Sequence, residues 1–327
     1  MRYLVRRVVF YLITAWAAIT INFFIPRLMP GNPVEILLSR FQGRLSPHET
    51  QSLLDLFGLN KHLSLLSQYG NYWAQLAHGN LGTSFTYFPT TVSQVISQSL
   101  PWTVVLIGLC TVISFILGTA LGTLIGWRRG SRLLEALVPG ATFFSSLPYF
   151  WLALICIYLF ASDLGWFPLS GGYSENATIG FTGSFIGSAI YHGLLPAITI
   201  VVSSMAGWIL GQRNMMVTTL SEDYVVMAEA EGLRDGRVMV SYAARNAILP
   251  QIASFAMSIG FVVSGALLVE IVFSYPGIGY VLYQAVTNED YPLMQGIFLV
   301  ITLAVLVANF AADLVYVFLD PRTRQEA

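Results

Sequence analysis

Long apolar stretches alternate with polar segments along this chain, and the apolar stretches set its architecture. The hydrocarbon core of a membrane is about 30 Å thick, and a helix needs about 20 apolar residues to cross it. Six windows meet this requirement, at residues 9–29, 101–127, 135–161, 194–213, 251–273 and 294–318. Apart from residues at the ends of the windows, the charged side chains inside them are Glu270 and Asp313. The pattern predicts an all-α polytopic membrane protein with six transmembrane helices.

The composition agrees with this pattern. The chain is 55% hydrophobic and 10% charged, with a mean hydropathy of +0.67. Soluble globular proteins carry roughly 25% charged residues, so this chain has too little polar surface to be one of them. Cys110 and Cys156 both lie inside apolar windows. We expect them to be small packing residues rather than disulfide partners or metal ligands.

The distribution of arginines predicts the orientation in the membrane. Twelve of the sixteen basic residues fall on one side of the predicted spans: Arg2, Arg6, Arg7, Arg128, Arg129, Arg132, Arg213, Arg234, Arg237, Arg245, Arg322 and Arg324. The opposite connections, residues 162–193 and 274–293, contain no Lys or Arg. Because basic residues favour the cytoplasmic side, both termini are predicted to be cytoplasmic. The first span is too long for a signal peptide and is expected to be a retained anchor.

The polar segment that follows the first span predicts a small helical subdomain outside the membrane, at residues 30–100. Ser46–Glu49 has the form of a capping box, and a second helix is predicted at residues 63–77, ending near Gly79. Its aromatic residues are expected either to touch a partner or to cover the membrane surface: Tyr69, Tyr72 and Trp73. The remaining organisation is a first unit at residues 1–29, a transmembrane domain at 101–318 and a cytoplasmic tail at 319–327.

Small residues and prolines predict how the spans pack. Gly118, Gly122 and Gly126 are four residues apart, so they form one flat helix face that lets another helix approach closely. We expect this face to pack mainly inside the subunit, with a dimer interface as the alternative. Pro148 and the Pro139–Gly140 pair predict kinked helices around a path.

Between the fourth and fifth spans, residues 214–250 form a polar segment of unusual composition. Ser221 is predicted to cap a helix whose first turn carries acidic residues, where negative charge suits the helix dipole. Gly232 fits the left-handed position that ends a helix, and Leu233 is placed for the accompanying apolar contact. This predicts a short acidic helix that stops at a glycine.

A second helix of this segment is predicted to begin with Asp235 as its cap and to end before Pro250. Two short helices joined at a glycine would form a rigid knob that a moving partner could grip. The alternative is an ordinary amphipathic surface helix, but such helices favour basic polar faces, whereas this one is acidic.

Ten short motifs carry a resemblance along the whole chain, and in order they are Arg2–Arg7, Arg27–Pro33, Gly79–Ser84, Leu100–Thr103, Ser146–Phe150, Leu164–Pro168, Leu195–Ala197, Glu270–Gly279, Asp290–Pro292 and Asp320–Arg322. Together they resemble the permeases of the dipeptide/oligopeptide/nickel group of ABC importers. The polar segment 214–250 resembles the EAA loop of these permeases, which docks on a separate ATPase.

The resemblance implies a membrane-spanning permease subunit of an ATP-driven, binding-protein-dependent importer in the bacterial cytoplasmic membrane. Its partners would be a homologous second permease (in a hetero- or homodimer), two cytoplasmic ATPase subunits, an extracytoplasmic solute-binding protein and membrane lipid, but no nucleic acid. ATP and Mg would bind the ATPase subunits, so this chain would be no enzyme and would hold no cofactor or metal. The solute would be an oligopeptide or an oligosaccharide, with nickel as an alternative.

The same resemblance implies which residues couple to the ATPase: Asp223, Tyr224, Ala228, Glu229, Ala230, Gly232, Leu233 and Arg234. The chain departs from the EAA pattern, because Val226, Met227 and Ala228 stand where Glu-Ala-Ala is expected. Contacts of the first glutamate are therefore not carried over. Glu229 and Glu231 replace an expected basic residue and favour the oligosaccharide branch, as does the Gln212–Met216 segment.

Candidate residues of the translocation gate lie at the end of the fifth span: Glu270, Pro276, Gly277 and Gly279. A carboxylate in a membrane helix is costly and is by default a functional candidate. The turn at residues 274–279 could also satisfy Glu270 with a backbone donor, which would make it a structural tie. Asp313 is expected to form a helix–helix hydrogen bond or to pair with an arginine.

Two other classes of membrane protein fit the sequence less well. An ion-coupled secondary transporter should carry inverted repeats and several charges at mid-membrane, and neither is visible. A membrane hydrolase needs a nucleophile–base or metal constellation, and the sequence shows none. The single lysine, Lys61, follows Asn60, so it cannot build a phosphate-binding loop.

Overall fold

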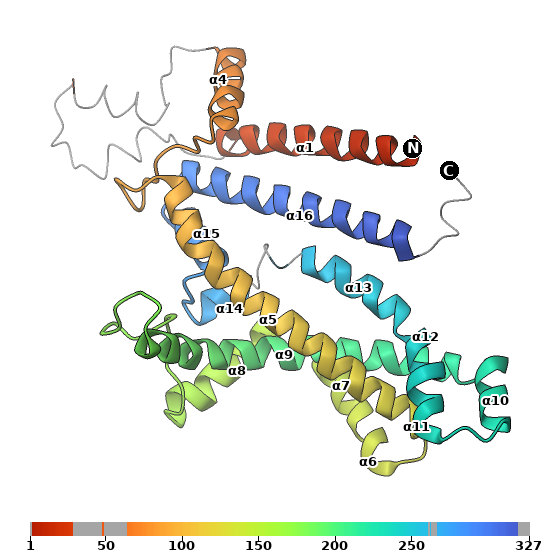
Figure 1. The fold of residues 1–327 in the computed structure, drawn as a ribbon. Helices are drawn as coiled ribbons and strands as arrows, with labels where there is room; N and C mark the ends of the chain where they lie inside the picture. The colour runs from red at the N-terminus through yellow and green to blue at the C-terminus, as the bar shows by residue number, and fades with distance from the viewer. Residues whose placement is uncertain (1, 29–47, 49–63, 261, 263–266, 320–327) are drawn as a thin grey trace.

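The computed structural model describes residues 2–28, 48, 64–260, 262 and 267–319. Within these residues every extended regular element is a helix (Figure 1). The helices are α1 (Arg2–Leu28), α4 (Leu65–Ala77), α5 (Val92–Trp127), α6 (Arg132–Glu135), α7 (Leu137–Ser146), α8 (Tyr149–Cys156), the π-helix η1 (Ile157–Asp163), α9 (Gly183–Thr219), α10 (Asp223–Ala230), α11 (Asp235–Arg237), the π-helix η2 (Val238–Ala244), α12 (Arg245–Ala247), α13 (Leu249–Gly260), α14 (Leu267–Val272), α15 (Ile278–Thr287) and α16 (Tyr291–Leu319).

Four helices are long and apolar enough to cross a membrane: α1, α5, α9 and α16. All four begin earlier than the apolar windows predicted, and the difference is largest for α5 and α9. The side chain of Thr91 accepts the Gln94 N–H at 3.3 Å and caps α5, and Thr182 caps α9 in the same way. These caps satisfy the first backbone donors, so the helices start well before residues 101 and 194.

The third predicted span, residues 135–161, is not one straight helix. Its two arms, Arg132–Ser146 and Tyr149–Asp163, are bent by 98° relative to each other. The break lies at Leu147, whose backbone is extended (φ −81°, ψ 127°). Leu147 precedes Pro148, and the proline ring disfavours a helical conformation in the preceding residue. The kink predicted at Pro148 is therefore confirmed.

In the fifth predicted span, residues 251–273, the described helices are α13 and α14, and residues 261 and 263–266 between them lie outside the described part of the chain. Helix α13 is too short to cross a membrane alone. The described residues thus contain four spanning helices, or five when the bent pair counts as one. The six-span count stays a prediction. The capping box at residues 46–49 (apart from His48) and the closing motif at 320–322 lie outside the described residues.

Helices α5 and α9 make the most extensive contact among the described helices. Three buried residues on one face of α5 are the predicted glycines, Gly118, Gly122 and Gly126. A Cβ atom added at Gly122 would lie 2.6 Å from the backbone oxygen of Ile209 in α9, and one at Gly118 would lie 2.9 Å from that of Met205. The glycine face therefore packs inside the subunit, as the sequence predicted.

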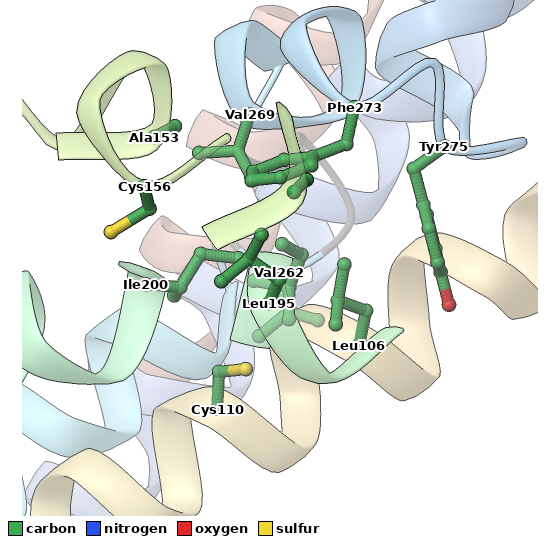
Figure 2. Close-up of a cluster of buried hydrophobic side chains, with 12 residues drawn as sticks. Leu106, Cys110, Ala153, Cys156, Leu195, Ile200, Val262, Val269, Phe273 and Tyr275 are labelled. Carbon is green, nitrogen blue, oxygen red and sulfur yellow. The ribbon is translucent and has the colours of Figure 1, made fainter. Parts of the chain in front are cut away.

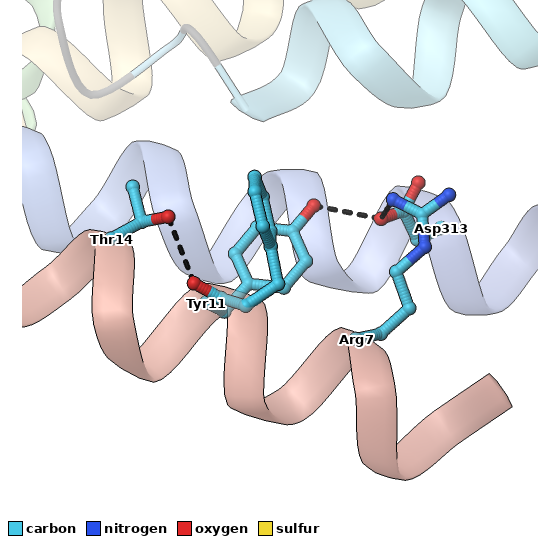
Figure 3. Close-up of polar contacts among 5 residues, drawn as sticks. Arg7, Tyr11, Thr14 and Asp313 are labelled. Carbon is cyan, nitrogen blue, oxygen red and sulfur yellow. Dashed lines mark hydrogen bonds and ion pairs between the residues drawn. The ribbon is translucent and has the colours of Figure 1, made fainter. Parts of the chain in front are cut away.

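Helices α1 and α16 run antiparallel and are joined by polar side chains along their length. At one end, Arg7 Nη1 lies 2.6 Å from Asp313 Oδ2, and the Tyr11 hydroxyl donates to the same oxygen at 2.8 Å (Figure 3). At the other end, Asn22 Nδ2 donates to the Gln295 backbone oxygen at 2.8 Å, and Gln295 Nε2 donates to the Asn22 backbone oxygen at 3.2 Å. The arginine partner predicted for Asp313 is confirmed.

Helix α4 matches the helix predicted at residues 63–77, and Gly79 follows it with a φ of +70°. It stands across the end of α1 (Figure 1). Its Tyr69 hydroxyl lies 2.7 Å from the Thr20 hydroxyl, and the Tyr72 ring packs against Phe23. These aromatic residues fix α4 to α1, which neither of the two roles expected for them had included.

The polar elements separate to opposite ends of the fold. The start of α1, the end of α16 and helices α10–α12 lie at one end, on the right in Figure 1. Helices α4 and α15 lie at the other end. The start of α1, the end of α16 and the polar helices α10–α12 thus lie at the same end of the fold, and which side of the membrane they face stays a prediction.

A methyl group at Gly122 tests the glycine contact. Gly122→Ala should lower the free energy of unfolding by about 1–3 kcal/mol, because the added atom overlaps the α9 backbone in a packed core. The measurement is denaturant unfolding of the purified subunit in detergent micelles. Gly207→Ala in α9 is the control, since a Cβ there meets no atom within 4 Å. Equal stability of both variants and the parent would contradict the packing role.

Candidate functional site

The polar segment after α9 folds into a knob, which we define as residues 222–247. Its first helix, α10, ends as predicted: Gly232 has a φ of +76°. The Gly232 N–H donates to the Glu229 oxygen at 2.9 Å, and the Leu233 N–H donates to the Ala228 oxygen at 3.4 Å. These two bonds form a Schellman motif, which satisfies the free carbonyls at the helix end. A residue with a Cβ would be strained at position 232.

The helix caps differ from the prediction. Glu222, with an extended backbone (φ −77°, ψ 139°), precedes α10 and takes the cap position. The Ser221 hydroxyl instead donates to the Thr218 oxygen at 2.7 Å, because the last carbonyls of α9 also need donors. Similarly, Arg234 takes the cap position of α11, and Asp235 is its first helical residue.

The second part of the knob consists of α11, the π-helix η2 and α12. It ends at Ala247, and α13 begins at Leu249 with Pro250 in its first turn, where a missing N–H costs nothing. The predicted boundary before Pro250 is therefore confirmed. The Asn246 Nδ2 atom donates to the Tyr224 hydroxyl at 3.0 Å, so α12 holds α10 in place.

The predicted coupling residues do not all face outward. Asp223, Tyr224, Glu229, Ala230, Gly232 and Arg234 are exposed, and Leu233 is half-buried. Ala228 is only 3% exposed and packs with Val225 and Val238 inside the knob. Its methyl group joins α10 to η2, so Ala228 contributes to the packing of the knob, and its role in coupling stays a prediction.

Two exposed residues of the knob were not among the candidates. Val226 and Met227 are 53% and 65% exposed on α10. They stand where the family pattern has Glu and Ala, and were set aside for that reason. Their positions in the helix could have indicated this exposure, because residues beside the buried stripe of a helix face outward. With Tyr224 they place an apolar surface on the outer side of α10.

At the opposite end of the fold, Glu270 of α14 forms what we call the outer tie. This side chain is fully buried. Its Oε1 atom accepts the Thr103 hydroxyl of α5 at 2.8 Å, and its Oε2 atom accepts the Gly279 N–H of α15 at 2.6 Å. The Ile278 N–H donates to Thr103 Oγ1 at 2.8 Å. One carboxylate thus connects three helices.

The other gate candidates surround this carboxylate closely. A Cβ added at Gly277 would overlap the Glu270 carboxylate, and one at Gly279 would lie 2.7 Å from Leu267 Cα. Pro276 lies against Gly172 of the preceding connection. This geometry supports the structural reading of Glu270, with backbone N–H groups as its donors. The role of these residues in a gate stays a prediction.

Apolar side chains surround the outer tie. Figure 2 shows Leu106 and Cys110 of α5 packed with residues of α8, α9 and α14 in one buried cluster. Cys156 of α8 is also a member, so both cysteines are free and buried, as predicted. Among the described residues, no three His, Cys, Asp or Glu side chains are grouped so that they could hold a metal ion.

Asp290 is a second buried carboxylate that sequence reasoning did not select. It accepts the Ser84 hydroxyl at 2.5 Å and the Thr86 N–H at 2.8 Å, and the Leu293 N–H at the start of α16 at 3.1 Å. Burial also raises the pKa of the neighbouring Tyr87 hydroxyl above its ordinary value. Asp290 and Ser84 both belong to motifs of the family resemblance, and this was the available signal.

Comparison with known proteins identifies the family of this chain. The family described as "Binding-protein-dependent transport system inner membrane component" matches residues 118–325. The chain belongs to this family. It is 34% identical, over 99% of both chains, to the di/tripeptide transport system permease protein DppB of Pseudomonas aeruginosa. It is 28% identical to the oligopeptide transport system permease protein AppB of Bacillus subtilis, over 98% of both chains. It is 29% identical to the dipeptide transport system permease protein DppB of Escherichia coli K12, over 100% of this chain and 99% of that one.

Membership confirms the resemblance seen in the motifs. The permease is an integral inner-membrane component of a binding-protein-dependent transport system. Membership of the family assigns the chain to one component of a transport system. It does not say what each side chain contributes.

Removing the Glu270 carboxylate tests the outer tie. Glu270→Ala should lower the free energy of unfolding by about 3 kcal/mol, because it leaves two buried donors without acceptors. Glu270→Gln should lose less, since its amide oxygen accepts from Gly279 and its NH₂ group donates to Thr103. Unfolding in detergent micelles measures both, with the exposed Glu175→Ala as control. If Glu270→Ala is as stable as the control, Glu270 is not a structural tie.

Proposed function

We propose that this permease forms one half of a path that carries peptides across the membrane, driven by separate ATPases that grip the knob. The relatives compared above are named for di/tripeptide, oligopeptide and dipeptide transport. Those names support a peptide solute. They do not support the oligosaccharide branch, which the sequence favoured, or the nickel alternative.

The shape of the knob is the observation that carries this proposal. Helix α10 lies at one end of the fold, away from α4 and α15 (Figure 1). Its inner stripe is buried against η2, and its outer side exposes Tyr224, Val226 and Met227. Large apolar side chains at an exposed polar end of a membrane protein favour a protein partner. A rigid end at Gly232 lets a partner push the knob without deforming it.

The partners follow from this role. A second, homologous permease completes the path, two cytoplasmic ATPases bind the knobs, and an extracytoplasmic binding protein delivers the solute. ATP closes the ATPase pair, and the knobs transmit that movement to the membrane helices. The coupling consists of the different affinities of the ATPases and the binding protein for two states of the permease pair. ATP and Mg bind the ATPases, so the permease itself catalyses no reaction.

We test the knob with a substitution at Gly232, the glycine that ends α10. Gly232→Val places a β-branched residue at a φ of +76°, which costs about 1–3 kcal/mol and tilts α10. Peptide uptake into cells should fall about tenfold or more, while the amount of permease in the membrane stays near normal. Radiolabelled trialanine uptake and quantitative immunoblotting measure the two quantities.

Gly236→Val is the matched control. Gly236 lies in α11, a Cβ there meets open space, and its backbone is helical. Its uptake should stay near the parental value. If Gly232→Val transports like Gly236→Val, the knob is only a surface helix and the proposed coupling is wrong.

The proposed orientation places the knob in the cytoplasm and α4 outside. Single cysteines at Asn176 and Ser131, in a variant with Cys110 and Cys156 replaced by alanine, test it with a membrane-impermeant maleimide. The cysteine at position 176 should react in intact spheroplasts, and the one at 131 only after permeabilisation. Equal reactivity of both in intact spheroplasts would reject this orientation.

A further inference from the structure

Trp127 is the last residue of α5, and it touches the knob on two sides. Its half-buried ring packs on one buried cluster that contains Ala243 and Ala247, and on another that contains Val225 and Ala228. The first cluster joins η2 and α12 to α9, and the second joins α10 to η2. The ring therefore touches both halves of the knob.

Contacts with α9 on both sides of Trp127 hold the end of α5 in place. The preceding residue, Gly126, lies so close to α9 that a Cβ there would be 2.5 Å from Met216 Cβ. Two residues after the ring, Arg129 Nη2 donates to the Val217 oxygen at 2.8 Å. The backbone at Trp127 is thus held between two contacts with α9. A movement of the knob against this ring must displace α5 and α9 together.

The other end of α5 carries the outer tie. Thr103 donates to Glu270 and accepts from the Ile278 N–H. No proline lies between Thr103 and Trp127, and at the ~1.5 Å rise per residue of an α-helix they stand about 36 Å apart. That distance matches the hydrocarbon thickness of a membrane, about 30 Å. The glycine contact with α9 stiffens the helix along this length.

We infer that Trp127 is a positioning residue for transport: it passes the movement of the knob to α5, which displaces Thr103 and so rearranges the outer tie. This inference rests on the proposed function and adds the route by which the ATPase reaches the outer face. The knob is also joined to α9 through the turn at residues 220–222. Helix α9 also packs against α14 in the buried apolar cluster, but the hydrogen bonds to Glu270 and from the Ile278 N–H are made by Thr103 of α5.

The test uses the assembled complex of permeases, ATPases and binding protein in nanodiscs. Three variants are compared with the parent: Trp127→Ala, Trp127→Phe and, as a control, Trp151→Ala, whose side chain is 55% exposed on α8. Two quantities are measured. The first is the stimulation of ATPase activity by binding protein preincubated with a mixture of di- and tripeptides. The second is the hydrogen exchange of residues 274–280, with and without ATP and vanadate.

Trp127→Ala should keep the ATPase subunits and the unstimulated activity, and lose stimulation by about fivefold or more. In the parent, ATP and vanadate should change the exchange of residues 274–280, whose amides include those bonded to Thr103 and Glu270. In Trp127→Ala this difference between the two states should disappear. A merely structural role would raise exchange in both states and leave the difference. Trp127→Phe should keep most of the response, and Trp151→Ala all of it.

Two results would overturn the inference. One is a Trp127→Ala complex with parental stimulation and a parental exchange difference. The other is loss of the ATPase subunits from both Trp127 variants, which would make the ring part of the docking surface alone. Failure of the proposed function is distinguishable, because then the parent itself would bind no ATPase or show no stimulation by the loaded binding protein.

Discussion

The close approach of α5 and α9 through three glycines is the contact on which the rest of the structure depends. The glycine face removes the α5 side chains from the crossing, so the backbone and Cβ atoms of α9 pack directly on the α5 backbone and dispersion contacts accumulate. It also leaves no room for sliding, since a single methyl group at Gly122 would meet the α9 backbone. The knob begins at the end of α9, and the outer tie includes Thr103 of α5. Both polar ends are therefore positioned by one apolar contact.

Buried carboxylates hold the helices where packing alone would not specify their register. Glu270 and Asp290 are each fully buried and accept hydrogen bonds from hydroxyl and backbone N–H groups. Asp313, nearer the polar end of α16, pairs with Arg7 instead. A buried carboxylate without donors would be prohibitively costly. Because each one accepts hydrogen bonds from residues distant in the chain, the native arrangement is the one in which all three are satisfied.

Much of the fold could be predicted from the sequence by itself. The apolar windows determined four long helices, although Thr91 and Thr182 extended two of them beyond their windows. Gly232 determined the end of α10, because a Schellman motif needs only local backbone groups and a residue tolerant of positive φ. The spacing of Gly118, Gly122 and Gly126 determined a flat helix face. These features depend on residues close in the chain, and local preference decides them.

Only the tertiary structure determined which side chains of these helices are buried and which partners they contact. Ala228 was expected to couple to a partner and is buried, because η2 packs on α10 and Trp127 of α5 packs on the same cluster. The donors of Glu270 come from α5 and α15, and those of Asp290 from residues 84 and 86, so no local pattern predicts them. Pro148 predicted a kink, but its angle of 98° is known only from the structure. A sequence specifies which groups need partners, but the packing of distant helices determines which partners they find.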